Sequence, residues 1–205
     1  MELTIPDLSL VVLIGASGSG KSTFAARHFA PTQVLSSDYF RGLVSDDVND
    51  QSASADAFDV LHYVAGKRLA AGRTTVIDAT NVQHEVRARL IAIAREQNVL
   101  PVAIVLDVPE ELCLARNAAR PDRDFGAHVV RRHRTDLRKS LKSLQKEGFR
   151  RVHVLHSQSE VDSAMEPPGR NTRRSSASAS AGRARCSKRA CENTTSIHSS
   201  GSGSW

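Results

Sequence analysis

The chain has 205 residues, with 28 Lys/Arg against 22 Asp/Glu and a formal net charge of +6. This length allows one α/β domain and a remainder, and no apolar run is long enough to span a membrane or placed to serve as a secretory leader. Three irregularly spaced cysteines argue against a disulfide framework or a zinc site, so we expect a soluble cytoplasmic protein with no membrane partner.

Short apolar runs predict five buried parallel strands, over residues 8–14, 33–36, 74–78, 101–107 and 151–156. Amphipathic periodicity predicts helices over residues 21–29, 55–71, 85–97, 110–119 and 127–146. Such strand–helix alternation is typical of an α/β fold with a doubly wound parallel sheet of about five strands. Ligands of these sheets bind at the carboxyl ends of the strands.

Residues 15–23 fit the pattern G-x-x-x-x-G-K-[ST], the P-loop, and stand between a predicted strand and a predicted helix. Backbone N–H groups of such a loop and of the following helix bind phosphate oxygens. Lys21 would reach the β- and γ-phosphates of ATP, and Ser22 would bind Mg²⁺. The predicted nucleotide-binding residues of the loop are Gly15, Ser17, Gly18, Ser19, Gly20, Lys21, Ser22 and Thr23. A chance glycine-rich turn is disfavoured because both flanks fit.

Acidic residues follow three of the predicted strands. Asp38 follows the second strand and would lie at the γ-phosphate end of the nucleotide, where an acceptor hydroxyl needs a base. Arg41, one turn further on, would hold an anionic acceptor group, although a capping Asp beside an exposed Arg also fits. Asp78 follows the third strand and is the candidate Mg²⁺ ligand, with a helix cap as the alternative role and Asp107 as the competing ligand.

Arg116, Arg120 and Arg123 form a cluster that predicts an arginine-bearing helical lid over the nucleotide. They begin a basic block, residues 116–151, that holds twelve Lys/Arg against four Asp/Glu. Such a block attracts phosphates, and a solvated basic helix face is the alternative.

The composition changes at about residue 166. Residues 168–205 hold seven Lys/Arg and one acidic residue, and Ile197 is the only Leu, Ile, Val or Phe after residue 166. A segment of this kind cannot bury enough apolar surface to offset its ordering entropy. We therefore predict a folded domain over residues 1–165 and a disordered Ser/Arg-rich tail over residues 166–205, which either binds nucleic acid weakly or is a non-native extension.

Four segments, GASGSGKSTFA, SSDYFRGLVSDDVNDQ, VIDATN and RNAARPDR, resemble the kinase domain of bacterial polynucleotide kinase-phosphatase, an RNA-repair family, over residues 8–156. The resemblance implies transfer of the γ-phosphate of ATP, with Mg²⁺, to the 5′-hydroxyl end of RNA or DNA. It implies that Asp38 is the general base and that Arg41 holds the phosphate on the acceptor's 3′ side. It also places Gln51 on a phosphate, and Arg116 and Arg123 on the phosphates of ATP.

The chain departs from this family after the predicted kinase domain. No D-x-H, G-D-x-H-G or K-x-D-G signature follows. We therefore expect kinase activity without the phosphatase and ligase-like domains of the larger repair protein. We interpret the tail as a truncation or frameshift product. One alternative is a P-loop kinase of a small metabolite or antibiotic, which would need neither the basic block nor the Arg41 clamp. Another is an ATP-switched binding module of the AAA ATPase type, disfavoured because no strand ends in Asp-Glu.

Overall fold

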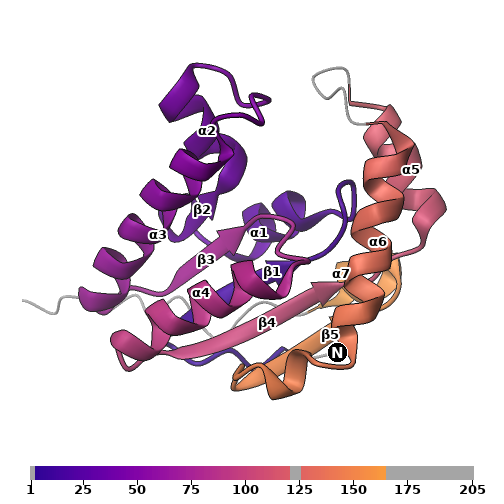
Figure 1. Cartoon of the computed structure of the whole chain (residues 1–205). Coiled ribbons are helices and arrows are strands. Elements are labelled where there is room, and N and C mark those ends of the chain that lie inside the picture. The colour runs from indigo at the N-terminus through magenta and orange to yellow at the C-terminus, as the bar shows by residue number, and fades with distance from the viewer. Residues whose placement is uncertain (1–2, 121–125, 165–205) are drawn as a thin grey trace, which may run out of the picture. The chain divides into compact units, whose positions relative to one another are not determined.

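A five-stranded, wholly parallel sheet forms the centre of the computed structural model, which describes residues 3–120 and 126–164 (Figure 1). Its strands are β1 (Ser9–Ile14), β2 (Val34–Ser36), β3 (Thr75–Asp78), β4 (Leu100–Leu106) and β5 (Arg151–Leu155). They lie in the order β2-β3-β1-β4-β5, and every neighbouring pair is parallel. The prediction of a doubly wound parallel sheet is confirmed, with strand bounds within one residue of those expected.

Helices connect these strands. They are α1 (Lys21–His28), α2 (Ser37–Ser45), α3 (Ser54–Ala70), α4 (His84–Glu96), α5 (Glu110–Ala118), α6 (Ala127–Leu141) and α7 (Gln158–Ser163), with 3-10 turns η1 (Pro31–Gln33) and η2 (Leu144–Lys146). The sequence did not predict α2 or α7. The single helix expected over residues 127–146 is divided into α6 and η2, because the chain turns at Ser143, whose backbone N–H and hydroxyl both donate to the carbonyl of Ser140.

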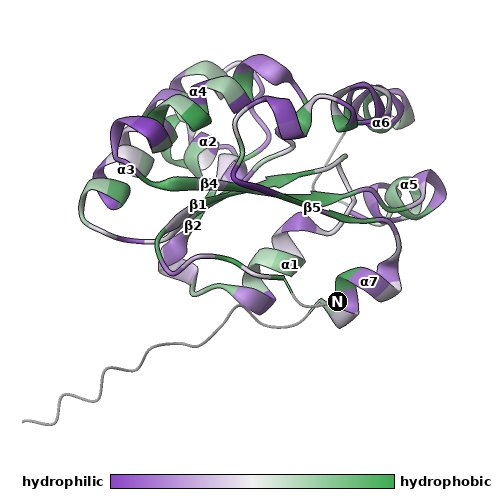
Figure 2. Ribbon diagram, turned by 90° about the horizontal axis from the view of Figure 1, so that it is seen from below, coloured by the Kyte–Doolittle hydropathy of each residue, from purple (hydrophilic) through white to green (hydrophobic). Residues whose placement is uncertain are grey.

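The winding of the chain decides which face each helix covers. The first crossover runs from the central strand β1 to the edge strand β2, whereas the following crossovers all run in the opposite direction across the sheet. Because parallel crossovers are right-handed, α1 must lie on the face opposite α3 and α4. Figure 2 shows this arrangement, with α7 beside α1. The reversal occurs at β1, and ligands of doubly wound sheets bind at such a switch point.

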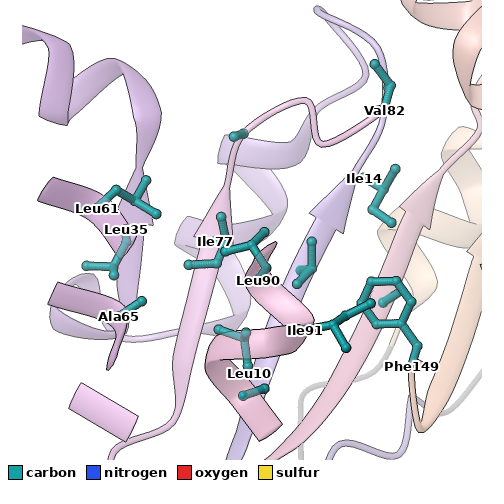
Figure 3. Close-up of a cluster of buried hydrophobic side chains, with 14 of the residues drawn as sticks. Leu10, Ile14, Leu35, Leu61, Ala65, Ile77, Val82, Leu90, Ile91 and Phe149 are labelled. Carbon is teal, nitrogen blue, oxygen red and sulfur yellow. The ribbon is translucent and has the colours of Figure 1, made fainter. Parts of the chain in front are cut away.

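β1 is buried along its whole length, as the apolar run of residues 10–14 predicts. Its alternate side chains enter two cores: Leu10 and Ile14 pack with α3 and α4, and Leu13 packs with α1. Figure 3 shows Leu10 and Ile14 within the first of these cores. A strand anchored on both faces gives the loop that follows it a rigid base.

Two predictions concern other parts of the chain. The predicted tail, residues 166–205, lies outside the described residues. Within residues 3–120 and 126–164, no helix is both long and apolar enough to cross a membrane.

Candidate active site

The P-loop connects β1 to α1 and folds around its own lysine. Gly18 and Gly20 have φ angles of +79° and +95°, in the left-handed region that favours glycine. The Nζ of Lys21, which is buried, donates to the carbonyl oxygens of Gly15 at 2.9 Å and Ala16 at 2.8 Å. The ammonium group is therefore held inside the loop, where the P-loop motif places it against phosphates.

Helix α5 packs directly on the P-loop. A Cβ on Gly18 would lie 2.3 Å from the backbone oxygen of Cys113, so only glycine allows this approach. The hydroxyl of Ser17 donates to Oδ1 of the buried Asn117 at 3.4 Å. Burial raises the pKa of the Cys113 thiol, whose side chain is fully buried in the core that α1 covers. Sequence reasoning did not single out Asn117.

A cleft of ≈ 350 Å³ opens beside the P-loop and gathers most of the predicted site residues. Lys21 and Ser22 line it together with Asp38, Asp78, Arg116 and Arg120. Arg41, Gln51 and Asp107 are not among its lining residues. The remaining predicted lid residue, Arg123, lies outside the described residues.

Two of the cleft carboxylates, Asp38 and Asp78, lie at or just after the ends of neighbouring strands. Asp78 is the last residue of β3 and is paired in register with Ser36, the last residue of β2. Asp38 follows two residues later, in the first turn of α2. The Ser22 hydroxyl and the Asp78 carboxylate are oxygen donors in one cleft, and such donors fit Mg²⁺.

Arg41 is turned toward Asp38. Its Nη2 forms an ion pair with Oδ1 of Asp38, and its Nε donates to the carbonyl of Val48 at 2.9 Å. Only 7% of the residue is exposed, and this burial lowers the pKa of Arg41, against the opposing charge of Asp50. In this structure the Arg41 guanidinium pairs with the candidate base, and Arg41 is not among the residues that line the cleft.

The competing metal ligand and the predicted glutamine occupy other environments. Asp107 forms an ion pair with Arg134 of α6, and Nδ1 of His156 lies 3.4 Å from its other oxygen. Gln51 is exposed, and its Nε2 donates to the carbonyl of Asn49 at 3.1 Å. Of the two candidate metal ligands, Asp78 is therefore the one that faces the cleft.

The loop after β3 is braced from behind. Asn81, with φ +49°, donates from Nδ2 to the carbonyl of Leu13 at 2.7 Å, and its own carbonyl accepts from Nη1 of Arg87 at 2.9 Å. Arg87 in turn makes two 2.7 Å bonds to Glu147, and both side chains are buried. Helix α4 has its N-cap at Gln83, so the alternative capping role for Asp78 is wrong.

Helix α7 contributes cleft residues that the sequence did not predict, Gln158 and Asp162, opposite Arg27 of α1. Its N-terminus carries a signal that could have identified it. Ser157 accepts from the backbone N–H of Glu160 at 3.2 Å, and the Glu160 side chain accepts from the backbone N–H of His156 at 2.7 Å. The pattern S-x-x-E is typical of a helix start.

Residues 10–144 match the model of a protein family described as an AAA domain, AAA_33. No curated protein sequence matches the chain. A candidate kinase of Chloroflexus aurantiacus is similar in structure, with 15% identity, a TM-score of 0.51, and coverage of 74% of this chain and 89% of that one.

Two further solved structures are similar over about half of their own length. A chain of the Pnkp1/Rnl/Hen1 RNA repair complex shares 23% identity at a TM-score of 0.58, over 68% of this chain and 47% of that one. A chain of the AvrRxo1-ORF1:ORF2 complex with ATP shares 16% identity at a TM-score of 0.52, over 67% and 49%. At these identities the likeness establishes the fold alone.

Proposed function

The chain belongs to the AAA domain family AAA_33 and has a P-loop kinase fold, and from this premise we propose that it transfers the γ-phosphate of ATP to the 5′-hydroxyl end of RNA or DNA. The observation that carries the proposal is that Asp38 and Lys21 line the same cleft. A phosphate-binding lysine and a carboxylate base facing one space are what a phosphoryl transfer to a hydroxyl requires.

The proposed step divides the work among these residues. The acceptor oxygen forms a bond to the γ-phosphorus, the bond from that phosphorus to the β–γ bridging oxygen breaks, and ADP leaves. Asp38 takes the proton of the hydroxyl. Lys21, Arg116 and Arg120 donate hydrogen bonds to the phosphate oxygens as negative charge develops. Ser22 and Asp78 would hold Mg²⁺, which would supply positive charge against the β- and γ-phosphates.

Arg41 supports the acceptor side through Asp38, because the ion pair between them fixes the direction of the carboxylate. A guanidinium has five N–H donors, and Val48 and Asp38 account for two of them. We propose that the phosphate on the 3′ side of the acceptor shares this guanidinium with Asp38.

The nucleic-acid end is the finer part of the proposal, and two observations support it. The segments around Asp38 and Arg116 resemble those of polynucleotide kinases, and a similar structure is a chain of an RNA repair complex. Because this chain covers 47% of that one, we propose that it acts within, or derives from, a larger repair protein.

A second acceptor class is favoured by the charge of the segment after Arg41. Residues 42–66 carry five acidic residues and no Lys or Arg; the acidic residues are Asp46, Asp47, Asp50, Asp56 and Asp59. A polyanionic strand would be repelled along this segment, whereas a small cationic acceptor such as an aminoglycoside antibiotic would be attracted.

One assay distinguishes these acceptors. The protein is incubated with labelled ATP and Mg²⁺, and with a 5′-hydroxyl oligonucleotide, an aminoglycoside or no acceptor. We expect label on the oligonucleotide, and Asp38→Ala should reduce the rate roughly 100- to 10,000-fold. The matched control is Glu85→Ala, an exposed carboxylate in the first turn of α4, which should keep the rate.

Each other outcome has a defined meaning. Label on the aminoglycoside alone would replace the proposed acceptor with the second class. ATP hydrolysis without transfer to either acceptor would favour an ATP-switched module. Transfer to the oligonucleotide that survives Asp38→Ala would keep the function and remove Asp38 as its base.

A further inference from the structure

Four polar side chains form a chain of hydrogen bonds across the mouth of the cleft. Nη2 of Arg116 on α5 donates to Oε1 of Gln158 on α7 at 2.9 Å. Nε2 of Gln158 donates to Oδ1 of Asp162 at 2.9 Å, and Nη1 of Arg27 on α1 donates to the same oxygen at 3.2 Å. All four residues line the cleft, so this chain joins the lid helix to the opposite wall.

The chemistry of the groups fixes the direction of this chain. An ionised carboxylate only accepts hydrogen bonds, so Asp162 requires the NH₂ side of the Gln158 amide. The amide oxygen then faces Arg116, whose guanidinium can only donate. The bond from Gln158 is the main reason that the pKa of Asp162 is lowered, and this carboxylate is ionised at neutral pH, where it accepts the bonds from Gln158 and Arg27.

The other end of the Arg116 guanidinium lies at the P-loop. Its Nη1 is 3.4 Å from the position that a Cβ on Gly20 would take. Gly20 is the N-cap of α1, where backbone N–H groups and the helix dipole attract phosphate. The Arg116 guanidinium therefore lies between the phosphate-binding end of α1 and Gln158 of α7.

Stability does not account for these contacts. The side chains of Arg27 and Asp162 are 52% and 51% exposed, and ion pairs this exposed contribute little to folding. Their effect on geometry is larger, because Arg116 is a long side chain that would otherwise sample many rotamers.

We propose that Gln158 is a positioning residue of the nucleotide site, which holds Arg116 at the rim of the P-loop, and that Asp162 sets the orientation of the Gln158 amide. The inference rests on the proposed function only in requiring that ATP binds in this cleft. It adds a short helix after β5 to the parts that prepare the phosphate site, and it predicts that Gln158 acts through Arg116.

The test is a double-mutant cycle on ATP binding, measured by equilibrium titration of the full chain with labelled ATP and Mg²⁺ without acceptor. Gln158→Ala should weaken binding about tenfold, since it removes a hydrogen bond to a charged group. Asp162→Asn, which allows the Gln158 amide to flip, should weaken ATP binding by less than Gln158→Ala does. In the Arg116→Ala background neither substitution should cause a further loss. Gln145→Ala, at an exposed glutamine of η2, is the matched control.

The oligonucleotide assay run beside the titration separates this inference from the proposed function. Coupled ATP binding without transfer to the oligonucleotide would keep the inference and remove the proposed acceptor. An unchanged affinity in Gln158→Ala, or the same loss with and without Arg116, would overturn the inference even where transfer occurs. A wild-type chain that binds no ATP would overturn both. Thermal unfolding of each variant should match the wild type, so a fall in affinity reports the site.

Discussion

Replacing Gly18 by alanine should force the P-loop and α5 apart. An added Cβ would lie 2.3 Å from the carbonyl oxygen of Cys113 and 3.1 Å from its carbonyl carbon. Both are backbone atoms of a helix, so neither can rotate out of the way as a side chain could. Gly18 also has a φ of +79°, so the substitution is strained even without the collision.

Gly72 allows the two effects to be measured separately. It follows α3 with a φ of +66°, and no described atom lies within 4 Å of an added Cβ. Left-handed strain alone costs about 1–2 kcal/mol, which is the loss expected for Gly72→Ala. Overlap with a packed neighbour adds about 1–3 kcal/mol, so Gly18→Ala should lose about 2–5 kcal/mol in the free energy of unfolding.

Urea unfolding at neutral pH measures both losses, and titration with labelled ATP measures the phosphate site. Gly72→Ala should keep the wild-type affinity for ATP, because it lies at the far end of α3 from the cleft-lining residues. Gly18→Ala should bind ATP much more weakly, because the loop has to move. Equal losses of stability in the two variants, or unchanged ATP affinity in Gly18→Ala, would refute the close packing of α5 on the loop.

Two further predictions concern buried charges. Glu147→Gln leaves Arg87 charged and without its carboxylate, so it should lower the free energy of unfolding at pH 7 by about 3–5 kcal/mol in urea titrations. Burial opposes the charged form of Glu147, but bonds from Arg87 and its neighbours lower the pKa of Glu147. The stability that this carboxylate contributes is therefore present above the ordinary carboxyl pKa and is lost as the pH falls through the lowered value. The free energy of unfolding of Glu147→Gln should accordingly depend less on pH in the acid range. Burial, with Arg89 nearby, lowers the pKa of His62 to about 4. As the pH falls, this histidine is protonated in the unfolded chain before it is protonated in the folded one, so the free energy of unfolding should fall by about 2 kcal/mol between pH 7 and pH 5. Urea titrations of His62→Leu at both pH values should lack that loss, and an equal loss in the variant would contradict the assignment.

Local patterns predicted the strands and the P-loop well for a physical reason. Strands buried on both faces are almost continuously apolar, as residues 10–14 of β1 and the residues of β4 are. The helices α3 and α4 are long enough for periodicity to appear, and their bounds were predicted to within one residue. The phosphate loop depends on consecutive residues and their own backbone angles, so its identity is contained in residues 15–23.

The two unpredicted helices are short, and α7 is polar as well. α7 has six residues and one buried side chain, so it gives no readable period, although Ser157 and Glu160 mark its start. α2 has nine residues and follows β2 without a connecting loop. The sequence placed Arg41 one turn beyond Asp38, but it did not predict the helix in which the two side chains pair.

The sequence by itself determined the order along the chain of the five strands and of the helices other than α2 and α7, the phosphate loop, and the acids at the strand ends. Only the tertiary structure decided that Asp78 rather than Asp107 faces the cleft and that Gln158 reaches Arg116. The reason is separation along the chain. A strand or a loop is specified by neighbouring residues, whereas these contacts depend on the winding of the sheet, which brings residues 42 positions apart to within a hydrogen bond.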